Sequence, residues 1–145
     1  INRKDIFIDF GCGKGRVLLI ASKYKFKKII GVEFSPQLVD IARSNVSICK
    51  DYNSFNIDII KIIKGDVLDY KYNNDETVFY LFNPFSNIIL DQLCAQIMKS
   101  IHQKPMKVYF IYVNPRFQNI IVANGFKKIN KINLINKMCY IYTNE

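Results

Sequence analysis

The sequence predicts an α/β fold with a mostly parallel sheet, and three observations carry this prediction. First, a β-branched and aromatic run at residues 6–10 leads into a glycine-rich turn and then into an apolar helical pattern. Second, strand signals alternate with helical ones along most of the 145 residues, as in successive β–α–β units. Third, no helix separates the last two strand signals, so these strands are expected to pair antiparallel.

The expected elements follow from hydrophobic periodicity and from turn residues. Ser35 and Pro36 are a good start for the second helix, because serine caps free N–H groups and proline suits the first helical position. Gly125 is expected to end the last helix in a left-handed conformation. Residues 67–76 read as a short irregular connection. The expected strands are residues 5–10, 29–33, 57–64, 78–82, 107–113, 126–134 and 137–143. The expected helices are residues 15–24, 35–46 with an apolar face of Leu38, Val39, Ile41, Ala42 and Val46, 87–101, and a short one opened by Asn114-Pro115.

Composition indicates one globular domain, residues 1–145, with enough chain for a sizeable core. No apolar run approaches the roughly 18 residues of a membrane helix, and no signal peptide precedes the first strand. The isolated cysteines and the lone histidine form no metal-ligand pattern, so we expect no metal and reduced thiols in a cytoplasmic protein. These residues are Cys12, Cys49, Cys94, Cys139 and His102. Because the sequence opens at Ile1, directly before a strand, we expect a longer natural chain.

The net charge of +9 raises the question of a nucleic-acid partner. The lysines gather at residues 23–28 and 127–137, and the chain is rich throughout in lysine, asparagine and isoleucine. This distribution favours a solvated surface over a dedicated nucleic-acid patch. The sequence leaves the partner open among a small molecule, a protein and a nucleic acid.

The glycine-rich turn after the first strand places Gly11, Gly13 and Gly15 at alternate positions. Glycine is needed where the backbone takes a positive φ or where a ligand approaches the chain closely. A dinucleotide fingerprint would read G-x-G-x-x-G, and this loop reads G-x-G-x-G instead. An NAD-type oxidoreductase is therefore disfavoured.

Three acidic residues each close a strand, and the carboxyl ends of parallel strands meet at one edge of a sheet. Each acid also has a purely structural interpretation. Asp9 would accept backbone N–H bonds from the glycine turn, Glu33 would be a solvated acid, and Asp66 would be a turn residue beside Gly65.

Asp9 with G-x-G-x-G, then GVE, GD and NPF at successive strand ends, resembles the class I S-adenosylmethionine-dependent methyltransferases. The resemblance spans essentially the whole chain and is strongest from Phe7 to Pro84. It implies a Rossmann-like three-layer sandwich with strand order 3-2-1-4-5-7-6, in which strand 7 is antiparallel. The segments FIDFGCGKGRVLLIA, GVE and GDVL are also similar to the non-SET histone-lysine methyltransferases, which does not identify a substrate.

The resemblance implies S-adenosylmethionine as cofactor, S-adenosylhomocysteine as product, and roles for individual residues. Asp9 would attract the α-ammonium group, Glu33 would hold the ribose hydroxyls, and Phe34 would cover the adenine, with Asp66 and Val67 at the ring edge. The glycine loop would contribute Gly11, Cys12, Gly13 and Gly15, with Cys12 shaping the loop.

Asn83, Pro84 and Phe85 resemble the [D/N]-P-P-[Y/F] motif of amino-group methyltransferases with one proline missing. Asn83 and the Pro84 carbonyl would accept hydrogen bonds from a target amine, and Phe85 would stack on the substrate. Asn83 is also counted among the cofactor-binding residues. The structural interpretation is that Asn83 caps the next helix and Pro84 starts it. A non-catalytic cofactor-binding module is thus the alternative to an enzyme. We also expect a preceding segment to complete the cofactor site in a longer chain.

Overall fold

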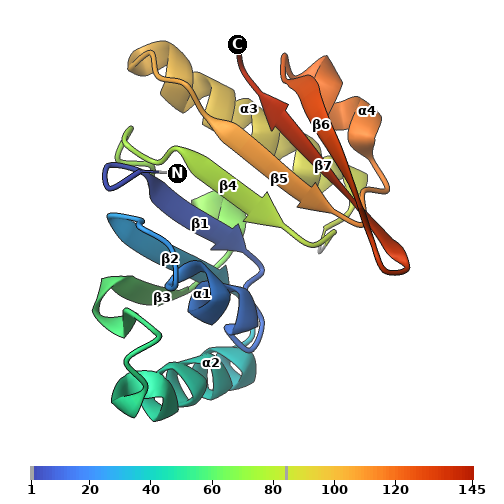
Figure 1. The fold of residues 1–145 in the computed structure, drawn as a ribbon. Coiled ribbons are helices and arrows are strands. Elements are labelled where there is room, and N and C mark those ends of the chain that lie inside the picture. Colours follow the sequence, from blue (N-terminus) through green and yellow to red (C-terminus); the bar gives the residue numbers. More distant parts are fainter. Residues whose placement is uncertain (1, 84) are drawn as a thin grey trace. The chain divides into compact units, whose positions relative to one another are not determined.

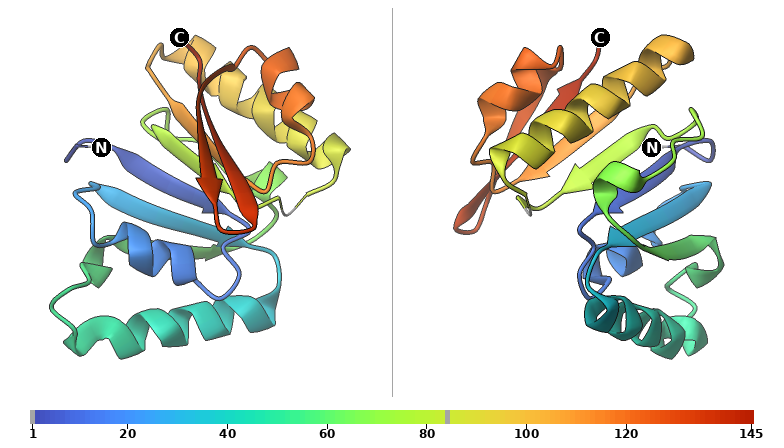
Figure 2. Two further views of the ribbon diagram at one scale, coloured as in Figure 1. Left: turned by 45° about the vertical axis from the view of Figure 1, so that its right-hand side comes forward. Right: turned by 180° about the vertical axis from the view of Figure 1, so that it is seen from behind.

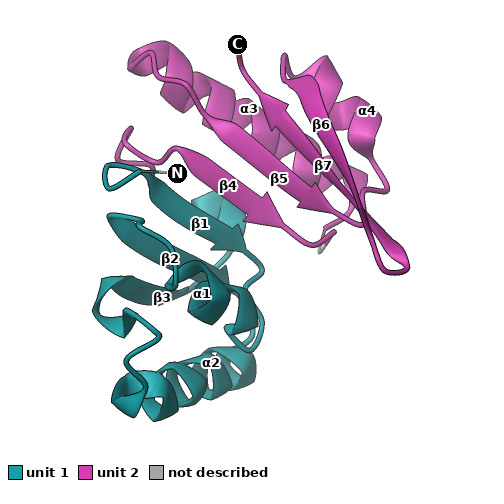
Figure 3. Cartoon of the chain, viewed as in Figure 1, with its two compact units in different colours: residues 1–70 teal, residues 71–145 magenta. Residues whose placement is uncertain are grey.

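The structure, a computed structural model, describes residues 2–83 and 85–145. The strands form a seven-stranded sheet in the order β3-β2-β1-β4-β5-β7-β6, with β7 antiparallel to β5 (Figure 1). This confirms the predicted strand order and the antiparallel last pair. The chain divides into two compact units, residues 1–70 and 71–145 (Figure 3), and each is described by itself.

The first unit contains three parallel strands, β1 (Ile6–Phe10), β2 (Lys28–Glu33) and β3 (Ile60–Lys64). All of β1 is buried, as expected for a parallel strand covered on both faces. Helix α1 (Arg16–Ala21) contacts β1 and β2, whereas α2 (Pro36–Ile48) contacts β2 and β3. Short 3-10 turns complete the unit at Cys49–Asp51, Ile57–Ile59 and Val67–Asp69.

Three expectations for the first unit were wrong in detail. The helix expected over residues 15–24 ends at Ala21, where the Ser22 hydroxyl donates back to the Leu19 carbonyl (2.8 Å). The strand expected from residue 57 begins at Ile60, because Ile57–Ile59 form a 3-10 turn. Ile41 is 40% exposed, so the buried stripe of α2 is narrower than its apolar pattern.

The second unit contains β4 (Val78–Leu81) and β5 (Tyr109–Val113), which are parallel, followed by the hairpin of β6 (Lys127–Leu134) and β7 (Lys137–Thr143). Helices α3 (Asn87–Gln103) and α4 (Gln118–Ala123) contact each other and lie on one face of these strands (Figure 2). Aromatic rings fill the core of the unit. The Phe110 ring lies 6.4 Å from that of Phe79 and 5.5 Å from that of Phe126, centroid to centroid.

Helix α3 begins at Asn87, as predicted, but the residues that lead into α3 and α4 behave differently from those expected. Asn114 has a left-handed φ of 51°, and α4 begins only at Gln118. The cap of α3 is Ser86, whose hydroxyl accepts the Ile89 N–H, so the structural interpretation of Asn83 as the cap is wrong. Gly125 has a φ of 92°, which confirms the predicted end of α4.

Among the described residues, none of the helices combines the length and apolar character needed to cross a membrane. The same residues contain no group of three or more His, Cys, Asp or Glu side chains arranged to hold a metal ion. All four cysteines are free thiols.

Candidate functional site

The loop between β1 and α1 takes its shape from three left-handed glycines. Gly11, Gly13 and Gly15 have φ values of 78°, 54° and 79°, a region that other residues enter only at a cost. The N–H groups of Gly11 and Cys12 both donate to the Val32 carbonyl, at 2.8 and 3.1 Å. These bonds fix the glycine loop (residues 11–15) against the end of β2.

Gly13 and Gly15 serve different purposes within this loop. A Cβ atom at Gly15 would lie 3.2 Å from the Cβ of Ala42, so this glycine permits close packing against α2. A Cβ atom at Gly13 would meet no atom within 4 Å. The backbone at Gly13 therefore borders open space, as required where a ligand approaches the main chain.

Glu33, the last residue of β2, joins two separate backbone segments. Its Oε2 accepts the Gly13 N–H and its Oε1 accepts the Ser35 N–H, both at 2.9 Å. The residue is only 9% exposed. The interpretation as a solvated acid is therefore wrong. Each carboxylate oxygen has a further lone pair, so the two bonds leave acceptor capacity for a ligand hydroxyl.

Asp9 lies beside Glu33 at the neighbouring strand end and is 3% exposed. Burial, and secondarily the charge of Glu33, raise the pKa of Asp9 to about 8. Within the described residues its carboxyl accepts no N–H bond from the glycine loop, because Glu33 makes that contact instead. Asp9 is thus a buried acid that a nearby cation would ionise.

Cys12 shows why a glycine is needed on the neighbouring strand. Burial, with smaller contributions from Asp9 and Glu33, raises the pKa of the Cys12 thiol to about 12, so the group is a poor nucleophile. A Cβ atom at Gly31 would lie 2.7 Å from the Cys12 sulfur and 2.6 Å from Cδ1 of Leu18. Gly31 therefore lets the loop and α1 pack directly on β2.

The third strand end supplies Asp66, whose Oδ1 accepts the Leu68 N–H at 2.9 Å. This is the turn role given as its structural interpretation, and it leaves the second carboxylate oxygen of Asp66 without a hydrogen bond among the described residues. Val67 is buried, while Phe34, which follows Glu33 in the sequence, is 74% exposed. An aromatic ring exposed directly after Glu33 is placed to cover a flat apolar ligand surface.

Asn83 follows β4 in the second unit and has a left-handed φ of 41°. Its Oδ1 accepts the hydroxyl proton of Tyr112 at 2.7 Å. Burial raises the pKa of Tyr112, so this hydroxyl stays protonated and remains a donor. Phe85 is half-buried and directly precedes the Ser86 cap, and Pro84 lies outside the described residues.

Sequence reasoning missed three residues that position these groups. Asn45 of α2 donates its amide to the Lys14 carbonyl (2.9 Å) and so holds the glycine loop from outside. Gly31 lets Cys12 and Leu18 pack against β2. Tyr112 donates its hydroxyl proton to Asn83. Only Gly31 carried a signal, because an isolated glycine in a strand often marks a close backbone approach.

The comparisons with known proteins agree with this geometry. Residues 7–104 match a family described as the methyltransferase domain. The ribosomal protein L11 methyltransferase of Clostridium perfringens is 28% identical over 116 residues, which is 78% of this chain and 33% of that protein. The chain therefore spans about a third of the length of this relative.

Solved structures show the same fold. An RNA methyltransferase from Salinibacter ruber, in complex with S-adenosyl-L-homocysteine, has a TM-score of 0.69 and 17% identity over 99% of this chain and 82% of that one. The magnesium protoporphyrin IX methyltransferase of Synechocystis, with bound S-adenosylmethionine, has a TM-score of 0.70 and 12% identity over 98% and 70%. The chain belongs to the methyltransferase domain family, in its class I, S-adenosylmethionine-dependent form.

Proposed function

We propose that this chain binds S-adenosylmethionine through residues of its first unit and transfers the methyl group to an acceptor, with an amino group as the leading candidate. The observation that carries the proposal is the Glu33 carboxylate between Gly13 and Ser35, beside the open backbone at Gly13. An acidic strand end that also fixes a glycine loop is suited to a ribose next to the main chain. The family membership supports the same cofactor.

The residues of the first unit fit the cofactor group by group. Asp9 is buried and would be ionised by an α-ammonium group, Glu33 has lone pairs for the ribose hydroxyls, and Phe34 presents an exposed ring to the adenine. Gly11, Cys12, Gly13 and Gly15 line the backbone side. Asp66 keeps one carboxylate oxygen for the adenine amino group, with the Val67 N–H beside it.

The cofactor supplies a methyl group already activated by a sulfonium, so the protein's task is alignment of the acceptor, which can contribute roughly 7–11 kcal/mol. We assign this task to Asn83, with Pro84 and Phe85 as its partners. The Tyr112 hydroxyl fixes the Asn83 amide and leaves one lone pair on Oδ1 for an acceptor N–H. The acceptor itself is unidentified. We also propose that residues 1–145 act as one domain in the cytoplasm, in line with their four free cysteines.

Isothermal titration calorimetry with S-adenosylmethionine and S-adenosylhomocysteine tests the proposal on the 145-residue chain. We expect saturable binding of both, lost in Gly13→Val and retained in the surface control Lys25→Gln. A side-by-side thermal-shift comparison with NAD should show stabilisation by S-adenosylhomocysteine alone. A folded chain that binds neither methyl-donor ligand would refute the proposal.

One observation favours a second function, a non-catalytic cofactor-binding module. The Tyr112 hydroxyl already occupies one lone pair of Asn83 Oδ1, the atom expected to meet the acceptor. Methyl-donor turnover over a panel of amine-bearing acceptors separates the two functions. Cofactor binding without turnover of any acceptor supports the module, and turnover that Asn83→Ala abolishes supports the enzyme.

A further inference from the structure

The carboxyl-terminal part of the chain is uniformly basic. No Asp or Glu occurs in the sequence between Asp91 and Glu145, and Lys and Arg occur there eight times. Four of these cations lie in the β6–β7 hairpin, namely Lys127, Lys128, Lys131 and Lys137. Every residue of β6 is exposed, so the edge of the second unit offers a row of positive charge to a partner.

The strand register places two of these lysines and one asparagine on the same face of the hairpin. Lys128 pairs with Tyr142, Lys131 with Tyr140, and Asn133 with Met138, and paired residues share a face. The Lys128 ammonium lies 4.6 Å from the centroid of the Tyr140 ring. We call Lys128, Lys131 and Asn133 the hairpin face; it presents two cations and an amide above an aromatic floor.

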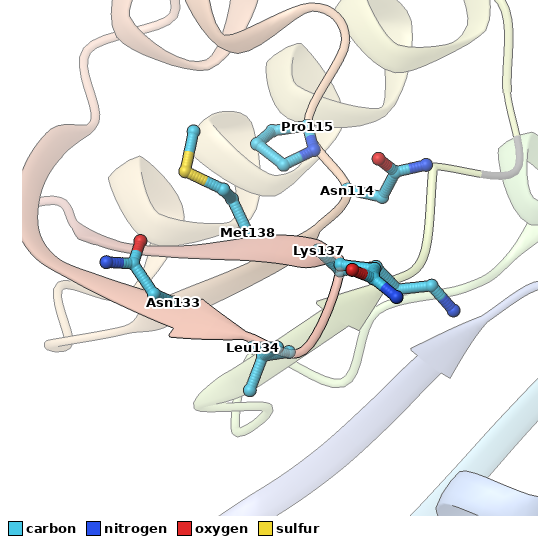
Figure 4. Close-up of a pocket in the computed structure, with 7 residues that line it drawn as sticks. Asn114, Pro115, Asn133, Leu134, Lys137 and Met138 are labelled. Carbon is cyan, nitrogen blue, oxygen red and sulfur yellow. The ribbon is translucent and has the colours of Figure 1, made fainter.

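A cavity of about 390 Å³ lies at the tip end of the hairpin face (Figure 4). Residues from the end of β5 and from both hairpin strands line this tip cavity. The Asn114 N–H donates to the Met138 carbonyl (2.7 Å), which fixes the two walls to each other. The lining residues are Asn114, Pro115, Asn133, Leu134, Asn136, Lys137 and Met138. Three amides and one cation around apolar side chains suit a flat ring with hydrogen-bonding edges that is attached to a phosphate.

A second cavity, of about 480 Å³, lies at the other end of the hairpin face. Apolar side chains of α4 and the ring of Tyr142 form it, with Lys128 and Gln118 at its border. The Tyr142 hydroxyl is buried and lacks a hydrogen-bond partner among the described residues. In β6, Lys131 lies between Lys128, which borders the second cavity, and Asn133, which lines the tip cavity. Cavities and cations therefore follow one another along the hairpin face.

The tip cavity also connects to the acceptor motif within the second unit. The Lys137 ammonium lies 4.6 Å from the centroid of the Phe82 ring, and Phe82 directly precedes Asn83. Phe82 is 42% exposed, so its ring is open to a ligand as well as to Lys137. A base bound in the tip cavity, which Lys137 lines, would thus lie near the residue that we assign to acceptor alignment.

We propose that the hairpin face and its two cavities bind the methyl acceptor as single-stranded RNA, with bases in the hollows and phosphates on Lys128 and Lys131. Single-stranded nucleic acid is bound in this way, by a positive track with aromatic or apolar seats for the bases. The amides of Asn114 and Asn133 suit base edges and the 2′-hydroxyl, which acts as both donor and acceptor. A second copy of the chain fits poorly at this edge, because the lysines of two copies would repel. That the RNA is the acceptor rests on the proposed function.

Fluorescence anisotropy with a labelled ten-nucleotide RNA of mixed sequence, without cofactor, tests the binding. We expect Lys128→Gln/Lys131→Gln to weaken binding about tenfold and to lower the salt slope by about 0.7 for each lost phosphate contact. Asn133→Ala should weaken binding about fivefold with the salt slope unchanged, because an amide contact releases no counterion. The control Lys25→Gln/Lys99→Gln carries the same change in net charge away from the hairpin and should bind like the parent chain.

Several outcomes would overturn the proposal. These are no RNA binding by the parent chain, equal weakening by the control, equal affinity for DNA of the same sequence, and tighter binding of a mononucleotide than of the RNA. Variants that weaken binding to phosphatidylserine vesicles while the RNA affinity stays unchanged would point to a membrane instead. The hairpin variants should bind S-adenosylhomocysteine with the same affinity as the parent chain, as measured by calorimetry. A parent chain that binds RNA but no S-adenosylhomocysteine would therefore refute the proposed function and leave the proposed RNA binding intact.

Discussion

The two units use different residues in the turns that follow their strands. In the first unit the turn after β1 uses three left-handed glycines, and the acid Glu33 holds the loop by its backbone. In the second unit the turns after β4 and β5 use left-handed asparagines, Asn83 and Asn114, each followed by proline in the sequence. Glycine leaves bare backbone at the turn, whereas asparagine adds an amide.

This difference indicates what each turn can offer to a ligand. A bare backbone next to a carboxylate suits a ligand that must come close to the main chain and that carries hydroxyls. An amide held in a left-handed turn presents a directed acceptor and donor instead. We therefore regard the glycine loop as the cofactor side and the asparagine turns as the acceptor side. Five predictions follow from that division, in order of decreasing expected effect.

Removal of the Glu33 carboxylate should have the largest effect. Glu33→Ala leaves the N–H groups of Gly13 and Ser35 without their acceptor, which should lower the free energy of unfolding by about 2–4 kcal/mol. Cofactor affinity should fall about 100-fold, or about 2.7 kcal/mol. Urea unfolding and calorimetry measure the two quantities. Asp40→Ala, an exposed acid of α2, is the control, and a similar loss in that variant would contradict the assignment.

Two glycines of the loop, Gly13 and Gly15, should respond differently to substitution by alanine. Gly15→Ala introduces a Cβ atom 3.2 Å from Ala42 at a left-handed φ, and should destabilise the chain by about 2 kcal/mol. Gly13→Ala meets open space, so it should cost only about 1 kcal/mol of backbone strain yet weaken cofactor binding about tenfold or more. Thermal unfolding and calorimetry on the two variants check this crossover. Equal effects on binding would mean that Gly13 does not face the ligand.

Cofactor affinity should rise with pH because Asp9 must ionise to bind a cation. Its pKa of about 8 leaves the group mostly protonated at pH 6, and binding of an ammonium would release that proton. Affinity should increase about tenfold or more between about pH 6 and pH 8, and Asp9→Asn should flatten this dependence. Calorimetry in buffers of different ionisation enthalpy measures the proton release directly. An unchanged slope in Asp9→Asn would exclude Asp9 as its source.

The same raised pKa has a consequence for stability. The folded chain binds a proton at Asp9 that the unfolded chain releases above its ordinary pKa of 3.8, so the free energy of unfolding falls as pH rises from about 4 to about 8. Asp9→Asn removes this loss. The variant should therefore gain thermal stability relative to the parent at pH 8 but not at pH 4.

The smallest expected effect concerns the backbone at Asn83. With a φ of 41°, Asn83→Ala should lower the free energy of unfolding by about 1 kcal/mol more than Asn83→Gly does, because glycine adopts this φ without strain. Both variants lose the hydrogen bond to Tyr112, so the difference between their free energies of unfolding measures the cost of the positive φ alone. Cofactor affinity should stay unchanged in both. A loss of cofactor binding in Asn83→Gly would place this residue on the cofactor side and break the division between the two turns.

Much of the fold was predictable because its signals are local. The positive φ values of the glycine loop, the Ser35 cap before Pro36 and the left-handed Gly125 each depend on a few consecutive residues. The start of α4 was not predictable, because Asn-Pro is compatible both with a helix start and with the left-handed turn that Asn114 adopts.

The sequence alone determined the strands and helices and the set of acids and glycines at the strand ends, since hydrophobic periodicity and glycine spacing are local patterns. The strand order followed from the resemblance of these motifs to the class I methyltransferases. Only the tertiary structure decided that Glu33, and not Asp9, holds the glycine loop. It also decided that Asn83 bonds to Tyr112 across 29 residues. Such partners depend on strand register and on burial, which bring distant residues together and which no local pattern of side chains records.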